Sequence, residues 1–369
     1  MKLFLATTTI NVPSLLRAYA QEAAELAAKR AFSFEFVVAG DRKSPLQVAP
    51  LLEELQSLYG VKMTYLSPAA QQELLLNNKA LKSYLDFDCI QRRNLAGYFA
   101  YINAADFIVY IDDDNLMGDH GYFSHHLEAM NLTQGPAISC PSGFYNIMSG
   151  ATGYHSGDWL FPRGFPFKDR NKKSSSQQKN FMGRICANAG LWTEEPDIDA
   201  VSRIAGRPLI DKYSLKNAST VLAPGTWSPI NSQNTCFRAE FLPTYYLSSH
   251  VGRYDDIFAG YVLQRIAMEL DFAVSFGEPV VRQERNEHDL LSDLNLENTG
   301  MKVIDYFLEE IRGYSLKGNS IQELLSSLLQ EMEGTLLELP KGHFAQNTFK
   351  ALHTGYSLWQ ELLLSKHSF

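Results

Sequence analysis

The feature that most constrains this chain is a run of five apolar residues, Phe107 to Ile111, that leads directly into Asp112, Asp113 and Asp114. Its β-branched and aromatic residues predict a strand that is buried on both faces. An apolar core would not accept unpaired carboxylates, so the aspartates should emerge at the carboxyl end of the strand, where open α/β sheets bind ligands. Asp112 and Asp114 point the same way on an extended chain. Clustered carboxylates suit a divalent cation, and such a cation suits a diphosphate; the alternative is a solvated turn that caps the next helix.

Short apolar runs and helical periodicity alternate along the N-terminal third of the chain, which is the pattern of a doubly wound α/β sheet. The expected strands cover residues 2–8, 34–39 and 61–66, and the expected helices start at residue 14 and cover residues 50–59 and 86–103. Polar residues follow the first two strands. Thr8 and Asn11 could contact a ligand, and Asp41 could accept hydrogen bonds from a base or ribose or could be a turn residue before a proline.

Further candidate binding residues follow later in the chain. Arg93 follows a second arginine on the first turns of the predicted helix 86–103, beside the suspected diphosphate site. Arginine pairs well with phosphate, although two arginines on a helix can equally form a solvated face. Trp192 could pack in the core or stack on a base or sugar. Asp197 and Asp199 could bind a substrate hydroxyl or cap the helix that follows.

Two further carboxylates, Asp255 and Asp256, stand at the start of a predicted helix directly after Arg253 and a tyrosine. Carboxylates favour a helix N-terminus, so capping explains one of them, but it hardly explains both with an arginine beside them. His288 follows the last predicted strands and is a candidate metal ligand.

The middle of the chain is expected to contain a helix at 121–130, a strand at 138–145, a long polar and aromatic loop at 150–180, and strands at 272–276 and 279–281. From about residue 300 the pattern changes to amphipathic helices, which are expected at residues 303–311, 321–337 and 344–364. This pattern predicts a domain at 1–298, with a nucleotide-binding half (1–117) and an acceptor half (118–298), and a helical extension at 299–369. The extension could pack on the core or form a homodimer.

Composition narrows the functional classes. A net charge of −8 argues against a general surface for binding nucleic acids or anionic membranes. Cys89, Cys140, Cys186 and Cys236 lack paired spacing and predict buried thiols, not disulfides or a zinc site. No apolar stretch is long enough for a transmembrane segment or a signal sequence, so the expected location is cytoplasmic.

Four sequence blocks carry a resemblance to a known family. They are Asp112-Asp-Asp-Asn115, Arg163-Gly-Phe-Pro-Phe167 with Arg170, Gly190-Leu-Trp192 with Pro196-Asp-x-Asp-Ala200, and Gly252-Arg-Tyr-Asp-Asp256 with Ala259-Gly260. The first resembles the Asp-x-Asp (DxD) motif of glycosyltransferases with the GT-A fold. Together, in this order, the blocks resemble the reversibly glycosylated polypeptides, or UDP-arabinopyranose mutases.

The resemblance implies a GT-A, Rossmann-like α/β fold with a mixed central sheet, a UDP-sugar donor, and Mn²⁺ or Mg²⁺. Asp112 would face the nucleotide ribose close to the metal, Asp113 would contact the nucleotide sugar, and Asp114 would bind the metal that bridges the diphosphate. Arg163 corresponds to the arginine that becomes glycosylated in that family, and Arg170 corresponds to a second arginine that is needed there.

The resemblance also implies the chemistry. Asp255 and Asp256 resemble the acidic pair of inverting GT-A enzymes, in which Asp256 would accept the proton of the acceptor hydroxyl. Breaking the sugar–diphosphate bond places negative charge on the leaving group, which a metal on Asp114, helped by His288, and a contact from Arg93 would stabilise.

Three functions fit these residues. The leading hypothesis is a metal-dependent glycosyltransferase that moves a sugar from a UDP-sugar to an acceptor hydroxyl of a glycan or small molecule. The second is a UDP-sugar pyranose/furanose mutase, which needs no external acceptor and only captures the anomeric carbon temporarily. The third is a non-catalytic nucleotide-sugar-binding protein with the helical extension as a partner surface.

Overall fold

The computed structural model describes residues 1–30, 32–118, 121–153, 160–172, 175–214, 219–285 and 289–365. The strands are β1 (Lys2–Thr9), β2 (Ser33–Gly40), β3 (Lys62–Leu66), β4 (Phe107–Ile111), β5 (Asn115–Met117), β6 (Gln134–Ser139), β7 (Ala151–Thr152), β8 (Gln177–Met182), β9 (Arg184–Glu194), β10 (Lys212–Tyr213), β11 (Ser219–Leu222), β12 (Asn234–Arg238) and β13 (Phe272–Gln283). The α-helices are α1 (Leu16–Lys29), α2 (Val48–Tyr59), α3 (Pro68–Leu74), α4 (Lys79–Tyr84), α5 (Arg93–Ile102), α6 (Tyr122–Met130), α7 (Ala200–Gly206), α8 (Asp255–Glu269), α9 (Leu290–Gly313), α10 (Ile321–Glu338) and α11 (Gln346–Leu364). Short 3₁₀ helices are η1 (Ile90–Arg92), η2 (Ile147–Gly150), η3 (Phe167–Asp169), η4 (Ala239–Thr244) and η5 (Gly252–Tyr254).

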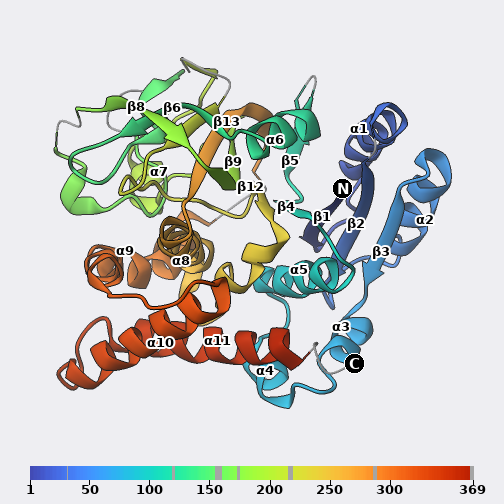
Figure 1. The fold of residues 1–369 in the computed structure, drawn as a ribbon. Coiled ribbons are helices and arrows are strands. Elements are labelled where there is room, and N and C mark those ends of the chain that lie inside the picture. The colour runs from blue at the N-terminus through green and yellow to red at the C-terminus, as the bar shows by residue number, and fades with distance from the viewer. Residues whose placement is uncertain are drawn as a thin grey trace.

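A mixed sheet runs through the molecule in the strand order β3-β2-β1-β4-β12-β9-β13-β11-β6-β8, with β5 paired to β13 (Figure 1). Strands β3, β2, β1 and β4 are parallel, and β12 lies antiparallel between β4 and β9. Because parallel strands share one carboxyl edge, the ends of β1, β2 and β4 meet there. The predicted α/β fold with a mixed central sheet and a C-terminal helical extension is therefore confirmed.

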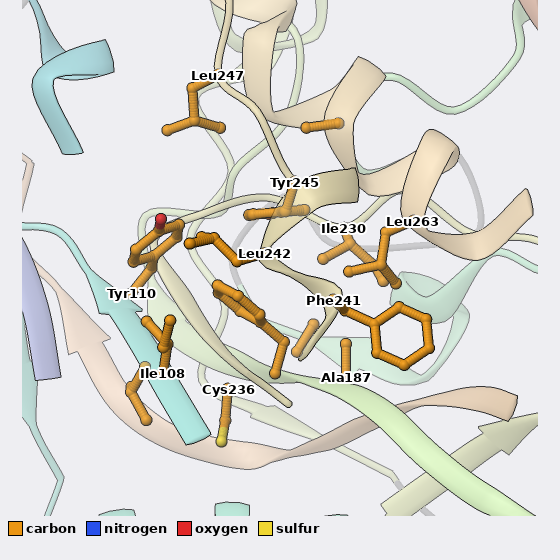
Figure 2. Packing of buried hydrophobic residues seen from close by; sticks show 14 of the residues in the cluster. Ile108, Tyr110, Ala187, Ile230, Cys236, Phe241, Leu242, Tyr245, Leu247 and Leu263 are labelled. Carbon is orange, nitrogen blue, oxygen red and sulfur yellow. The ribbon is translucent and has the colours of Figure 1, made fainter. Parts of the chain in front are cut away.

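Burial explains why these segments form strands and helices. Every residue of β4 is buried, as its unbroken apolar run predicts. Figure 2 shows Ile108 and Tyr110 of β4 packed near Cys236 of β12 and Leu242 of η4. On α1, the buried residues recur at helical spacing and face the sheet: Leu16, Tyr19, Ala20, Ala23 and Leu26.

Two predicted boundaries are wrong for physical reasons. The strand expected at 138–145 is β6, which ends at Ser139, because the chain then turns: the Gly143 N–H donates to the Cys140 carbonyl at 2.8 Å, and Gly143 has φ +84°. The helix expected at 86–103 starts only at Arg93, after η1, since Asp88 has φ +55° and interrupts it.

Two other expected elements merge or lengthen. The strands expected at 272–276 and 279–281 form the single strand β13, whose pairing with β9 shifts register between Gly277 and Val281, around Pro279. The helix expected at 303–311 is α9, which begins at Leu290, so the predicted division at residue 298 falls inside a helix.

The C-terminal helices pack on the sheet domain; Figure 1 shows α10 and α11 as a layer beside α8 and α9 that reaches α4. The buried Trp359 donates from Nε1 to the Leu242 carbonyl at 3.3 Å, and the Tyr356 hydroxyl donates to the Thr244 carbonyl at 2.9 Å. The extension is therefore part of the same core, and a homodimer through these helices stays a prediction.

The four cysteines are free thiols; Cys140, Cys186 and Cys236 are buried as predicted, whereas Cys89 is half-buried. Among the described residues, no helix combines the length and apolar character that a membrane span requires.

Candidate functional site

A cavity of about 230 Å³, here called the strand-end cavity, opens at the carboxyl ends of β1 and β2. It is lined by Thr8, Thr9, Ile10, Ala39, Gly40, Asp41, Asp88, Cys89, Ile90, Arg92 and Asp113. Ile10 and Ile90 are 55% and 45% exposed, so they offer apolar surface on which a flat ring could pack. The structure thus brings the predicted Thr8, Asp41 and Asp113 together, whereas the exposed Asn11 is not part of the lining.

Asp41 forms the turn that was one of its two predicted roles, and it also lines the cavity, where a contact with a base or ribose stays a prediction. In the turn, its Oδ1 accepts from the Lys43 N–H at 2.9 Å and its own N–H donates to Ser44 Oγ at 2.7 Å. Burial raises the pKa of Asp41, and the neighbouring carboxylate of Asp88 adds to the rise. Asp88 is itself bonded to the guanidinium of Arg42.

Arg92 is a buried cation that the described part of the protein leaves without a hydrogen-bond partner. It is 3% exposed, and none of Nε, Nη1 and Nη2 has an acceptor within that part of the chain. The guanidinium lies over the ring of Phe87 at 3.9 Å from its centroid, and burial lowers the pKa of Arg92. Since a buried unsatisfied donor costs about 1–3 kcal/mol, an acceptor-bearing ligand is the natural partner.

The neighbouring Arg93, which the sequence favoured as the ligand contact, is instead used internally. It is fully buried, its Nη1 donates to the backbone oxygen and Oγ of Ser232 at 2.8 and 2.9 Å, and its Nη2 pairs with Asp112 Oδ1 at 2.5 Å. Arg93 therefore fixes the start of the aspartate turn, and Asp112 faces Arg93.

The other two aspartates of the turn have different surroundings. Asp113 Oδ2 accepts from Thr9 Oγ1 at 2.9 Å, and burial raises the pKa of Asp113. Asp114 Oδ1 is buried, and no described residue donates to it. Burial and then the charge of Asp112 raise the pKa of Asp114 to about 7, although Arg285 opposes this rise.

A divalent cation fits this turn through Asp114. A buried carboxylate oxygen without a donor, beside two further carboxylates, is the environment in which a hard cation replaces a proton. Over the described ranges, however, no three His, Cys, Asp or Glu side chains converge as a complete metal site. The other predicted ligand, His288, lies outside the described residues.

A second charged cluster forms where the loop of residues 160–172 meets the start of α8. Arg163 is 7% exposed and lies between two carboxylates: its Nε and Nη2 donate to Asp197 at 3.0 Å each, and its Nη1 and Nη2 donate to Asp256 at 3.1 and 3.2 Å. Asp256 Oδ2 also accepts from the backbone N–H of Ser232 at 3.0 Å. Through Ser232 and Arg93 this cluster is linked to Asp112.

Asp255 adjoins this cluster but is bonded differently. Its Oδ2 accepts from Gln91 Nε2 at 2.8 Å, and Gln91 lies between two residues of the cavity lining, Ile90 and Arg92. Burial, followed by the charge of Asp256, raises the pKa of Asp255 to about 7.

The remaining predicted residues are not part of the cavity lining. Arg170 pairs with Asp199 at 2.7 Å and lies 4.0 Å from the centroid of Phe167. Asp199 also caps α7, where its side chain accepts from the Ser202 N–H. Arg253 pairs with Asp293 at 3.1 Å.

Trp192 packs in the core at 4% exposure, beside Arg163 and Asp197. Its packing agrees with the core alternative that the sequence left open. Its Nε1 has no acceptor among the described residues.

Sequence reasoning missed Arg285 and Ser232, and it named Arg93, not the adjacent Arg92, as the ligand contact. Arg285 donates to Asp197 at 3.3 Å, Ser232 links Arg93 to Asp256, and Arg92 faces the cavity. Only Arg92 carried a sequence signal, as one of two adjacent arginines before the aspartate strand.

Solved structures that are similar to this chain include two with 10% sequence identity to it. One is a mannosyltransferase from Pyrobaculum calidifontis in complex with GDP-Man and Mn²⁺, with a TM-score of 0.38 over 99% of this chain and 85% of that chain. The other is a mannosyl-3-phosphoglycerate synthase from Rubrobacter xylanophilus, with a TM-score of 0.35 over 86% and 76%.

Curated relatives are similar over part of their length. The probable UDP-arabinopyranose mutase 2 of Solanum tuberosum is 24% identical over 214 residues, which cover 55% of this chain and 54% of that protein. UDP-arabinopyranose mutase 2 of Arabidopsis thaliana is 24% identical over 237 residues, or 61% of each chain. UDP-arabinopyranose mutase 3 of Arabidopsis thaliana is 30% identical over 128 residues, or 33% and 32%. The chain thus spans between about a third and three fifths of these relatives.

A family-level comparison covers more of the chain. The model of the family described as "Reversibly glycosylated polypeptide" matches residues 72–360. This range includes the aspartate turn, the Arg163 cluster and most of the helical extension. The chain therefore belongs to the reversibly glycosylated polypeptide family.

Proposed function

We propose that this protein is a metal-dependent enzyme that binds a UDP-sugar at the strand-end cavity and transfers the sugar to an acceptor hydroxyl. The observation that carries the proposal is Arg92, a buried guanidinium that lines the cavity without a protein acceptor in the described structure. Such a group favours a ligand rich in carbonyl or phosphate oxygens. A nucleoside diphosphate has both.

The cavity lining supports a nucleoside in particular. Ile10 and Ile90 offer apolar surface to the faces of a base, while Asp41 and Asp88 can accept hydrogen bonds from its N–H groups or from ribose hydroxyls. Thr9 already holds Asp113 at the cavity, so the diphosphate would extend from there toward Asp114.

Asp114, with Asp112 beside it, would hold Mn²⁺ or Mg²⁺. When bound, the cation supplies positive charge that stabilises the departing diphosphate. The protein's own contribution is positional: Arg93 fixes Asp112, and Thr9 fixes Asp113.

Transfer to a hydroxyl also requires a proton acceptor. Asp255 and Asp256, at the start of α8, are the proposed groups, because both are buried carboxylates. Asp256 is linked to the aspartate turn through Ser232 and Arg93, and Asp255 accepts from Gln91, which stands next to the cavity residues Ile90 and Arg92.

A second candidate is a UDP-sugar mutase. It is favoured by the relatives, which carry the name UDP-arabinopyranose mutase. The binding chemistry would be the same, and the two functions differ in whether the sugar leaves with an acceptor or returns to UDP.

Chromatography with mass detection separates these functions. The purified protein is incubated with a panel of UDP-sugars and Mn²⁺, with an EDTA control and Asp114→Asn as the matched variant. Metal-dependent release of UDP, to water or to added acceptors, supports the transferase, and an isomeric UDP-sugar without UDP release supports the mutase. If the protein binds UDP in a metal-dependent way but forms no product with any donor or acceptor, both enzymatic functions are refuted and a non-catalytic nucleotide-sugar-binding protein is supported.

A further inference from the structure

Arg285, which follows β13, stands beside the aspartate turn. Strand β13 pairs with β5, the strand that begins directly after the turn. Just beyond this pairing, the Glu284 N–H donates to the Asp114 carbonyl at 3.3 Å. The Arg285 N–H donates to Glu195 Oε2 at 3.0 Å on the other side. The backbone that carries Arg285 is therefore held next to the carboxylate proposed to bind the metal.

The guanidinium of Arg285 is largely buried but only partly bonded. Its side chain is 9% exposed, and Nη2 donates to Asp197 Oδ1 at 3.3 Å and to the Pro196 carbonyl at 3.5 Å. Its Nε is buried and has no acceptor among the described residues. Both contacts of Nη2 are long, since a charged N–H donor prefers about 2.7–2.9 Å to a carboxylate. Arg285 thus keeps hydrogen-bonding capacity that the described part of the protein does not use.

A second guanidinium, that of Arg203 on α7, lies close to the first. Arg203 Nη2 donates to the same Pro196 carbonyl at 2.5 Å, so two cations converge on one neutral acceptor. Burial and then the charge of Arg285 lower the pKa of Arg203 to about 10, although Asp197 and Glu195 oppose this decrease. Two like charges in one largely buried place favour the binding of a further anion.

The charges at the turn indicate which anion fits. Burial raises the pKa of Asp114, and the charge of Arg285 opposes this rise, so the guanidinium acts on the same carboxylate as a metal would. A divalent cation that binds Asp114 alone is therefore repelled by Arg285. A diphosphate removes this conflict, because its oxygens can bind the cation and also accept hydrogen bonds from Arg285.

We propose that Arg285 binds the diphosphate of the nucleotide and, while the nucleotide is absent, weakens the binding of a divalent cation at Asp114. The site consequently takes up the metal mainly together with the nucleotide. The identity of the ligand rests on the proposed binding of a UDP-sugar. The position of Arg285 beside Asp114 does not depend on that function, so the two can fail separately.

The first experiment measures the binding of Mn²⁺ alone, by electron paramagnetic resonance of the free ion. Arg285→Met removes a nearby positive charge, so Mn²⁺ should bind about three- to tenfold more tightly than to the wild type. The matched control is Arg282→Met, because Arg282 lies on the same strand, pairs with Glu284 and has a side chain that is 51% exposed. Its Mn²⁺ affinity should stay within about twofold of the wild type, since solvent screens an exposed charge. Unchanged or weaker Mn²⁺ binding by Arg285→Met would overturn the proposal.

The second experiment measures UDP and inorganic pyrophosphate by calorimetry at saturating Mn²⁺. Arg285→Met should bind both ligands about 10- to 100-fold more weakly, because a hydrogen bond from a charged donor is lost. Wild-type affinity of this variant for pyrophosphate would refute the diphosphate contact. If the wild type binds pyrophosphate but not UDP, the proposed function fails and the pyrophosphate affinities decide the role of Arg285. If the wild type binds neither ligand, both proposals fail.

A second variant separates binding from folding, because Arg285→Met also removes a donor from the buried Asp197. The carboxamide of Arg285→Gln can still donate to Asp197 but carries no charge. Urea unfolding first shows which variants are folded, and Arg285→Gln then serves where Arg285→Met does not fold. It should show the same pair of opposite changes, with tighter binding of Mn²⁺ alone and weaker binding of pyrophosphate with Mn²⁺. Loss of affinity for both would show that Arg285 only supports the structure of the turn.

Discussion

Arg92→Met should weaken UDP binding strongly without weakening the ligand-free fold. Methionine has a similar length but needs no hydrogen-bond partner. Removing a buried unsatisfied donor gains about 1–3 kcal/mol, and losing the cation–π contact with Phe87 costs about 0.5–2 kcal/mol. The free energy of unfolding should therefore rise by about 1 kcal/mol.

The effect on binding has the opposite sign. A hydrogen bond from a charged donor contributes about 1.5–3 kcal/mol. A loss of about 2–3 kcal/mol from UDP binding raises the Kd roughly 30- to 160-fold. A residue that matters only for packing would not show this combination, because its removal would lower stability.

The adjacent Arg93 provides a matched control. Arg93→Met removes the ion-pair partner of the half-buried Asp112 and both bonds to Ser232, so it should destabilise the protein by about 1.5–3 kcal/mol. Urea unfolding of the ligand-free proteins and calorimetry with UDP and Mn²⁺ give both quantities. The reasoning is refuted if Arg92→Met lowers stability by more than about 2 kcal/mol or binds UDP like the wild type.

Three further predictions follow from single residues. Asp114→Asn should reduce UDP affinity with Mn²⁺ to the value with EDTA, measured by calorimetry; a remaining metal effect would contradict the assignment. Burial raises the pKa of Glu297 to about 7, so its folded pKa exceeds its unfolded value and stability should fall as pH rises from about 4.5 to 7. In urea unfolding at several pH values, Glu297→Gln should reduce the dependence of the free energy of unfolding on pH. An unchanged pH dependence would contradict the role given to Glu297. Trp359→Ala should lower the free energy of unfolding by about 3–5 kcal/mol, and calorimetry should still show one unfolding transition because the extension shares the core. A separate transition at lower temperature would show that the extension unfolds independently.

The sequence predicted the central strand and its aspartates because both signals are local. A wholly apolar run fixes β4, and the carboxylates must then leave the core at its end. The strand expected at 138–145 failed for a local reason too, since apolar residues on both sides of a Pro-Ser-Gly turn look continuous in composition.

The choice between Arg92 and Arg93 could not be made from sequence. Adjacent residues on a helical turn point in different directions, and nothing near them in the chain says which direction is the core. Ser232 and Asp112, which engage Arg93, are distant partners brought in by β12 and β4. Arg163 is similar, because its partners Asp197 and Asp256 lie 34 and 93 residues away.

The charges that stay unsatisfied indicate the kind of ligand that this edge of the sheet is built for. Arg93, Arg163, Asp197 and Asp256 form ion pairs inside the protein. Over the described ranges, Arg92 has no acceptor for any of its three side-chain nitrogens, and the buried Oδ1 of Asp114 has no donor. Arg92 therefore needs acceptors, and Asp114 needs a donor or a cation.

A simple anion would satisfy Arg92 alone, and a simple cation would satisfy Asp114 alone. A nucleoside diphosphate with a bound divalent metal satisfies both, because its oxygens can meet Arg92 while its metal meets Asp114. UDP and Mn²⁺ should consequently each raise the affinity for the other by the same factor, and Arg92→Met and Asp114→Asn should each reduce that factor. Calorimetric titrations of each component with and without the other measure it, and independent binding of the two would contradict this account of the site.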